Sequence, residues 1–194
     1  MFMKKKIKIN LGCGSHIIEG DEWVNVDNYL LFNGEPRKHF VQADIIKPLP
    51  FETNSVDYII CDQVLEHIPM KDIPGVLYEI RRVLKEKGTA TIIVPDFKGA
   101  VEQWLKIDHN QNFDPTVYTW LSEVVYGNQT HQGEFHKTAM SAGYLNYVLN
   151  MVGLVNHKLI LYPAFGTIPN YEGVRPYEKN AVCRNAQLVA EIIK

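Results

Sequence analysis

The feature that most constrains this chain is an apolar run, a segment with helical periodicity and a second apolar run, in that order. Residues 56–61 (VDYIIC) form a continuous apolar segment, as expected of a central parallel strand. From about Asp72, which we place at the N-cap, apolar side chains recur at helical spacing, and Gly88 suits the position after the helix. Residues 89–94 (TATIIV) form the next strand. Such a unit predicts parallel strands joined by a helical crossover.

Shorter strand-like segments lie on both sides of this unit. Three precede it and two follow it, at residues 7–11, 23–27, 40–43, 155–161 and 186–193. The last two are joined by a connection rich in Pro, Gly and Tyr that leaves no room for a helix, so we expect them to pair antiparallel. The pattern predicts a Rossmann-like, doubly wound α/β fold whose mostly parallel sheet ends in an antiparallel strand pair.

Residues 97–140 are the least regular part of the chain. We expect one helix within them, capped by Asp114, begun by Pro115 and ended by Gly127. A further helix should follow Ser141. We place the irregular segment over the carboxyl ends of the strands, where ligands bind in open α/β sheets, as a lid or acceptor region of a single domain that spans residues 1–194.

Charge and composition exclude several classes of protein. The 20 Lys and Arg residues are balanced by 22 Asp and Glu, which gives no electrostatic footprint for nucleic acid. No apolar stretch reaches the roughly 20 residues of a membrane-spanning helix, and the lysine-rich start does not resemble a signal peptide. The three cysteines, Cys13, Cys61 and Cys183, form no CxxC pair, so we expect neither disulfides nor a zinc ribbon, and a reducing cytoplasm as the compartment.

Three strand ends carry residues suited to a nucleoside. Gly12-Cys13-Gly14 follows the first strand, where glycines let the backbone approach a ligand. Asp27 ends the second strand and can accept both hydroxyls of a ribose. Asp44 follows the third strand and can accept a hydrogen bond from the adenine amine. Together these positions predict a cleft for an adenosine-containing cofactor.

The residues leave the kind of adenosine open. A dinucleotide fingerprint, G-x-G-x-x-G, would need glycine at Ile17, and too few residues separate Gly14 from Trp23 for a full crossover helix. These features disfavour an NAD- or nucleotide-sugar-binding oxidoreductase without excluding one. A non-catalytic protein that only binds the cofactor is a further alternative.

Several ordered motifs resemble one known family. IKINLGCG, WVNVD, QADI, SVDYIICDQVLEHI, EIRRVLKEKGTATIIVPD and the later MVGL are similar to class I S-adenosylmethionine-dependent methyltransferases. Within that class the chain most resembles small bacterial predicted methyltransferases with a GWVNVD-like second strand. The resemblance implies a seven-stranded sheet with a reversed final strand, S-adenosyl-L-methionine as cofactor and S-adenosyl-L-homocysteine as product.

The resemblance also implies a role for each residue that matches the family's cofactor motifs. Asn10, Gly12, Cys13 and Gly14 would surround the methionine part, Asp27 and Asn28 the ribose, Asp44 and Ile45 the adenine, and Asp62, Gln63 and Leu65 the methyl side. Glu66-His67 matches a common Glu-His pair that opens the next helix.

The chain departs from the family pattern at the first strand and at the helix that would follow it. Asn10 stands where an acidic residue usually meets the cofactor ammonium, and the first helix is truncated. Lys6 and Lys8 share a face of the strand with Asn10, although a doubly wound central strand is normally apolar on both faces. We therefore expect that face to be open to water or to a second subunit in a homodimer.

The sequence gives the least information about the methyl acceptor. We expect a small-molecule or sugar-type acceptor that is methylated on oxygen or nitrogen. His136 and His131 are the candidate general bases, since an imidazole titrates near neutral pH, and the alternative is that both are solvated loop residues. Together with Glu134 they do not have a recognised metal-binding spacing, so we expect no metal.

Overall fold

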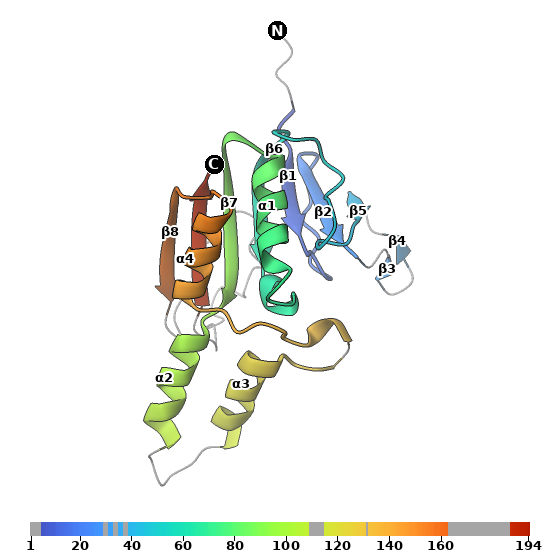
Figure 1. The fold of residues 1–194 in the computed structure, drawn as a ribbon. Helices are drawn as coiled ribbons and strands as arrows, with labels where there is room; N and C mark the ends of the chain where they lie inside the picture. The colour runs from blue at the N-terminus through green and yellow to red at the C-terminus, as the bar shows by residue number, and fades with distance from the viewer. Residues whose placement is uncertain are drawn as a thin grey trace.

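The fold is built on one mixed, seven-stranded sheet. The structure is a computed structural model that describes residues 5–28, 31–32, 35–36, 39–108, 115–130, 132–162 and 187–194. The sheet has the strand order β5-β2-β1-β6-β7-β9-β8 (Figure 1). Its strands are β1 (Lys8–Leu11), β2 (Trp23–Asp27), β5 (Phe40–Gln42), β6 (Val56–Asp62), β7 (Leu84–Pro95), β8 (His157–Tyr162) and β9 (Gln187–Ile193). A separate two-stranded ribbon, β3 (Leu31–Phe32) with β4 (Glu35–Pro36), was not expected from the sequence.

Strand direction confirms the predicted fold class. The pairs β1–β2, β1–β6, β2–β5 and β6–β7 are parallel, and β9 runs antiparallel to both β7 and β8. The parallel strands therefore bring their carboxyl ends to one edge of the sheet, at Leu11, Asp27, Gln42 and Asp62. In an open α/β sheet that edge is where ligands bind.

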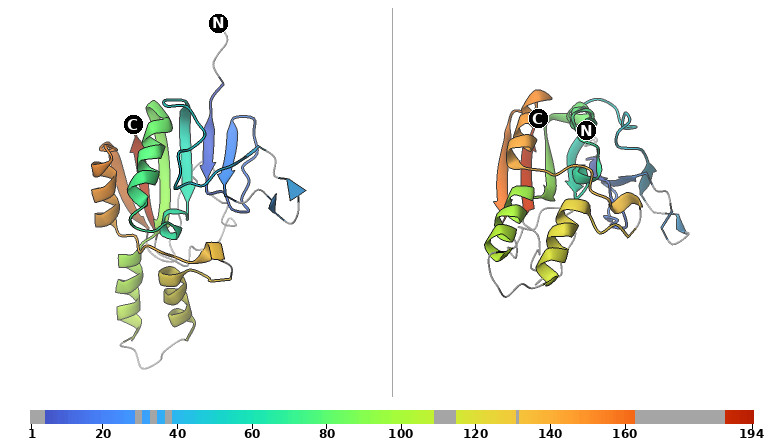
Figure 2. Two further views of the ribbon diagram at one scale, coloured as in Figure 1. Left: turned by 45° about the vertical axis from the view of Figure 1, so that its right-hand side comes forward. Right: turned by 60° about the horizontal axis from the view of Figure 1, so that its bottom comes forward.

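One face of the sheet is covered by the helices α1 (Ile73–Val83) and α4 (Ala142–Met151) (Figures 1 and 2). The apolar stripe of α1 packs on alternate residues of the strands, such as Ile9 and Ile59, in the main hydrophobic cluster. Ser141 caps α4 as expected, since its side chain accepts a hydrogen bond from the Tyr144 N–H at 3.3 Å. The larger share of the core thus lies on this side.

The end of α1 differs from the prediction. The helix stops at Val83, because Leu84 turns to extended backbone and pairs with Val56 at the start of β7. Gly88 therefore lies inside β7 and not beyond the helix C-terminus, so that assignment was wrong. Asp72 is the N-cap residue, but its side chain makes no capping hydrogen bond.

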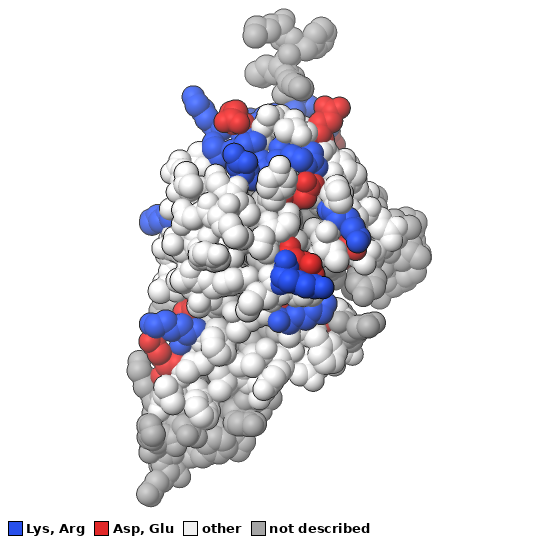
Figure 3. Space-filling view, viewed as in Figure 1, with Lys and Arg blue, Asp and Glu red and all other residues white. Residues whose placement is uncertain are grey.

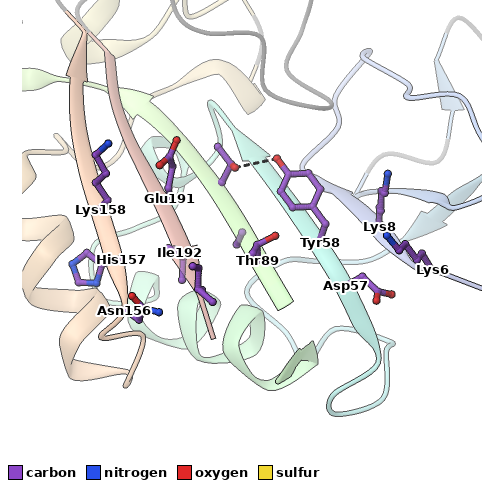
Figure 4. A pocket seen from close by; sticks show the side chains of 13 residues that line it. Lys6, Lys8, Asp57, Tyr58, Thr89, Asn156, His157, Lys158, Glu191 and Ile192 are labelled. Carbon is purple, nitrogen blue, oxygen red and sulfur yellow. Dashed lines mark hydrogen bonds between the residues drawn. The ribbon is translucent and has the colours of Figure 1, made fainter. Parts of the chain in front are cut away.

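The opposite face has a smaller cover in the described part of the chain. Residues 12–22 join β1 to β2 without a helix, as the short spacing predicted. Trp23, Ile60, Ile93 and Val189 form a separate small apolar cluster there. Polar side chains from five neighbouring strands line a hollow of about 730 Å³ on the same face, among them Lys8, Tyr58, Thr91, Glu191 and Lys158 (Figure 4).

Two helices lie beyond the carboxyl ends of the parallel strands. They are α2 (Phe97–Asp108) and α3 (Pro115–Tyr126), at the bottom of Figure 1. The expected helix is α3, whereas α2 was not foreseen. The Phe97 N–H donates to the Met140 carbonyl at 3.0 Å, which ties the start of this segment to its end.

Positive and negative side chains are mixed on the surface, in keeping with the nearly balanced numbers of basic and acidic residues. On the face drawn in Figure 3, Lys and Arg side chains are interspersed with Asp and Glu, and the largest group lies at the top of the view, away from α2 and α3. Among the described residues, no helix combines the length and the apolar composition that crossing a membrane requires.

Candidate functional site

The glycine loop and the end of β2 meet directly. The Gly14 N–H donates to Asp27 Oδ2 at 2.8 Å, and the Gly12 and Cys13 N–H groups both donate to the Val26 carbonyl, at 2.8 and 3.1 Å. These bonds fold the loop back over the end of β2 and orient the Asp27 carboxylate. The structure thereby brings together the glycine pair and the first of the two predicted aspartates.

The position of Gly12 requires glycine for two reasons. Its φ of +70° is a conformation that side chains disfavour, and a Cβ built there would lie 2.5 Å from a methyl carbon of Val64. Val64 follows β6, so the Gly12 backbone and the Val64 side chain approach each other closely here. The loop can therefore lie close against the end of β6 and leave its backbone free of side chains toward a bound nucleoside, and in that respect this chain's residues fit S-adenosylmethionine.

Asn10 lies beneath this loop and is almost completely buried. Its amide donates to the His16 carbonyl at 2.8 Å and to Asn25 Oδ1 at 2.9 Å. Asn25, which is fully buried, also accepts from the Ile18 N–H at 2.9 Å and donates to the Ile18 carbonyl at 3.1 Å. This pair of asparagines holds residues 12–22 in the place of a crossover helix, a function that the sequence did not indicate.

The predicted adenine and ribose residues lie at neighbouring strand ends. Asp44 Oδ1 accepts from the Ile46 N–H at 3.2 Å, so the carboxylate shapes the turn after β5, while Ile45 is buried beside it. Asn28 is exposed, and its carbonyl accepts from Gln42 Nε2 at 2.9 Å. All of them lie at the edge that carries Asp27.

The end of β6 carries the three residues that were predicted to line the methyl side. Asp62 is buried, Gln63 has a φ of +55° and donates from Nε2 to Gln187 Oε1 at 2.8 Å, and Leu65 is fully buried in the main core. Leu65 can therefore act on the predicted methyl side only from behind, through the residues packed on it. Asp96, which the sequence analysis did not select, is buried after β7, and burial raises the pKa of its carboxyl.

The Glu66-His67 pair does not open α1. It lies in a short 3-10 helix, η1 (Leu65–His67), because Pro69 and a turn separate it from the helix at Ile73. Segment 132–140 crosses it: the Lys137 and Thr138 N–H groups donate to the Glu66 carbonyl at 2.7 and 3.1 Å. The pair is thus held against the region that was expected to carry the acceptor.

This crossing brings His136 against His67. The two ring centroids are 4.8 Å apart with an interplanar angle of 77°. Burial lowers the pKa of both imidazoles, which favours their neutral forms at neutral pH. The proximity of Glu66, His67 and His136 was not predicted, because nothing in a sequence shows which loop residues meet. His131, the other base candidate, lies outside the described residues.

Comparisons with known proteins bear on the class of the enzyme. Residues 10–92 match the family model described as methyltransferase domain. No curated protein matches the chain.

Solved structures share the fold at low sequence identity. A SAM-dependent methyltransferase from Archaeoglobus fulgidus has a TM-score of 0.58 and 13% identity, over 97% of this chain and 86% of that one. Another from Methanosarcina mazei has a TM-score of 0.60 and 13% identity, over 98% and 93%. The complex between the Haloferax volcanii Trm112 methyltransferase activator and a methyltransferase gives a TM-score of 0.59 and 16% identity, over 99% and 83%.

The class predicted from the sequence is therefore confirmed. The methyltransferase-domain match over residues 10–92 and the sheet order shared with the solved methyltransferases support an enzyme that transfers a methyl group with S-adenosylmethionine as its cofactor. The match favours this class over the oxidoreductase alternative.

Proposed function

We propose that this enzyme methylates an oxygen or nitrogen atom of a small-molecule or sugar-type acceptor, and that it belongs with the small bacterial methyltransferases whose second strand resembles GWVNVD. The contact between Gly14 and Asp27 carries the assignment of the cofactor cleft. We assign the methionine part of the cofactor to Gly12 and Gly14, with Cys13 and Asn10 shaping their loop. Asp27 and Asn28 take the ribose, Asp44 and Ile45 the adenine, and Asp62 and Gln63 line the methyl side, with Leu65 behind them.

The acceptor would enter between the strand ends and the segment of residues 97–140, which we propose to act as a lid of the single domain. Bound S-adenosylmethionine would supply an electrophilic methyl group, so the chain's task is to orient the acceptor and exclude water. His136 Nδ1 lies 2.8 Å from the Val124 carbonyl, which can only accept. The proton is therefore on Nδ1, and Nε2 has the lone pair that a general base needs.

The cofactor assignment is tested by thermal stabilisation. S-adenosylmethionine and S-adenosylhomocysteine should each raise the melting temperature, since a ligand at a hundred times its Kd adds about 2.7 kcal/mol, and NAD should not. Asp27→Ala should abolish most of that shift, whereas Asp21→Ala, an exposed residue of the preceding turn, should keep it. An intact shift in Asp27→Ala would remove the ribose assignment.

The acceptor side needs a separate experiment. His136→Ala should leave the cofactor-induced shift intact and lower turnover by roughly 10²–10⁴-fold on an oxygen acceptor. Unchanged turnover would reduce His136 to a structural loop residue. Cys13 and Cys61 are both buried, and we propose a reducing cytoplasm as the enzyme's location.

A further inference from the structure

Three potential metal ligands converge beside the proposed cofactor cleft. Glu66 and His67 come from η1 after β6, and His136 comes from the segment that crosses it. One ligand atom from each side chain lies within 4.8 Å of those of the other two. The arrangement is fixed from both sides, since Thr138 Oγ1 also donates to the Ile68 carbonyl at 2.7 Å.

Both imidazoles are oriented as metal ligands commonly are. His67 Nδ1 lies 3.2 Å from the Phe135 carbonyl, and His136 Nδ1 has its partner in the Val124 carbonyl. A carbonyl oxygen only accepts, so each neutral ring carries its proton on Nδ1 and its lone pair on Nε2. A backbone carbonyl on the far nitrogen is the usual outer partner of a metal-bound histidine, where it fixes tautomer and ring orientation.

Glu66, the third potential ligand, adds a negative charge at a position that is shielded from water. Glu66 is 1% exposed, and a carboxylate removed so far from water is stabilised by a cation next to it. We propose that Glu66, His67 and His136 bind a divalent transition-metal ion, and that Zn²⁺ is the ion their chemistry suits. Two imidazoles and one carboxylate are a known ligand set of catalytic zinc sites, whereas Mg²⁺ and Ca²⁺ prefer oxygen ligands alone.

Three protein ligands would leave the fourth position of a tetrahedral Zn²⁺ for a further ligand. Tetrahedral Zn²⁺ with bonds of about 2.0–2.2 Å needs ligand atoms about 3.3 Å apart, so the side chains must close by up to about 1.5 Å from their present separation. An acceptor hydroxyl in the open position would have its pKa lowered by the ion and would release its proton to solvent. In the loaded site, His136 Nε2 is then a ligand and not the base. This last step rests on the proposed function, but metal binding itself does not.

The test is the affinity of the full chain for zinc chloride after treatment with a chelator. Isothermal titration should find one Zn²⁺ per chain, and magnesium chloride should give no heat of binding. We expect His67→Ala, His136→Ala and Glu66→Gln each to weaken Zn²⁺ binding by roughly tenfold or more. Circular dichroism and the S-adenosylmethionine-induced shift in melting temperature establish that each variant is folded.

Two controls make the result specific. His39→Asn changes an exposed histidine before β5, at the amino end of its strand, and should keep full affinity. Glu134→Gln tests the competing set of His131, Glu134 and His136, and it too should keep full affinity. The proposal is overturned if the wild type binds no Zn²⁺, or if Glu134→Gln weakens binding while Glu66→Gln does not. If the cofactor assignment were wrong, S-adenosylmethionine would not raise the melting temperature of the wild type, but Zn²⁺ would still bind.

Discussion

At the scale of single residues, buried asparagine side chains hold the connection between β1 and β2, where many α/β proteins have a helix. Asn25 makes hydrogen bonds to Asn10 and to both backbone groups of Ile18, and its Nδ2 also lies 3.4 Å from the His39 carbonyl. One side chain therefore connects the β1–β2 loop to the start of β5. A buried donor that loses its partner costs about 1–3 kcal/mol, so such a hub has a large effect on stability.

Asn25→Ala should accordingly lower the free energy of unfolding by about 3 kcal/mol, because it leaves one N–H of the Asn10 amide and the Ile18 N–H without their acceptor. Urea denaturation followed by circular dichroism measures this loss. Asn28→Ala, at an exposed position three residues along, should stay within about 0.5 kcal/mol of the wild type. Equal effects of the two substitutions would mean that the hub does not hold the loop.

Gly12 and Gly75 offer a second residue-scale comparison. Gly12→Ala should greatly reduce the thermal shift with S-adenosylmethionine, since its Cβ would collide with Val64 and its φ is positive. Gly75 lies in α1 with nothing within 4 Å of a new Cβ, so Gly75→Ala should stabilise the protein by about 0.5–1 kcal/mol and leave the shift unchanged. Normal cofactor binding by Gly12→Ala would contradict the proposed role of Gly12 in the cofactor loop.

Sequence patterns identified the right residue types at the site but not their partners. Asn10 was predicted to surround the methionine part, and its buried contacts show a second, structural task. The Glu-His pair was noticed, yet its approach to His136 depends on a crossing between residues 66 and 137. Such long-range contacts leave no periodicity or spacing in the sequence.

At the scale of elements, α1 anchors the loop that follows β5. Arg82 makes two hydrogen bonds of 2.8 Å to the Glu79 carboxylate, and donates to the carbonyls of Leu49 at 3.0 Å and Phe51 at 2.9 Å. Glu79 also accepts from the Leu49 N–H at 2.8 Å. These bonds attach residues 49–51, close to the proposed adenine residues, to the helix.

This anchor predicts a definite pH dependence. The hydrogen bonds from Arg82 lower the pKa of the Glu79 carboxyl below its usual value of 4.5. The stabilisation that the ionised Glu79 carboxylate provides is therefore fully present above pH 4.5 and is lost as the pH falls through the lowered pKa. Glu79→Gln should cost about 1–3 kcal/mol near neutral pH, and the difference from wild type should shrink below about pH 4.5.

Urea titrations at several pH values measure this difference. Glu86→Gln is the matched control, because its side chain is largely exposed and its ion pair with Lys194 Nζ is long, at 3.8 Å. A difference that grows toward acid pH would contradict the anchor.

Elements with a strong periodicity were predictable, and those without one were not. The stripe of Val76, Leu77 and Ile80 predicted α1 because each of them packs into the core. Helix α2 has no comparable stripe: of its described side chains only Ala100 is fully buried, in a small cluster with Val124. Tertiary contacts with α3 therefore set its place, and local sequence could not.

At the scale of the whole molecule, the relative directions of the strands followed from the pattern of connections, whereas their order in the sheet came only from the structure. A helical crossover requires parallel neighbours, and a final pair of strands without a helix requires reversal, as the pairing of β8 with β9 confirms. The polar face of β1 indicated that one side of the sheet differs from a doubly wound core. A continuous polar row across five strands, with Tyr58 Oη donating to Thr91 Oγ1 at 3.0 Å, appears only in the structure (Figure 4).

This difference between the two faces of the sheet predicts that core substitutions on them lower the free energy of unfolding by unequal amounts. Leu77 is fully buried between α1 and the sheet, whereas Ile160 is only partly buried on the opposite face. Leu77→Ala should lower the free energy of unfolding by about 3–5 kcal/mol, because it leaves a cavity that close-packed neighbours cannot fill. Ile160→Ala should cost about 1 kcal/mol, since water already reaches part of the side chain and little area is lost. Urea denaturation of both variants compares the faces directly, and a larger loss for Ile160→Ala would mean that the polar face carries as much of the core as the helical one.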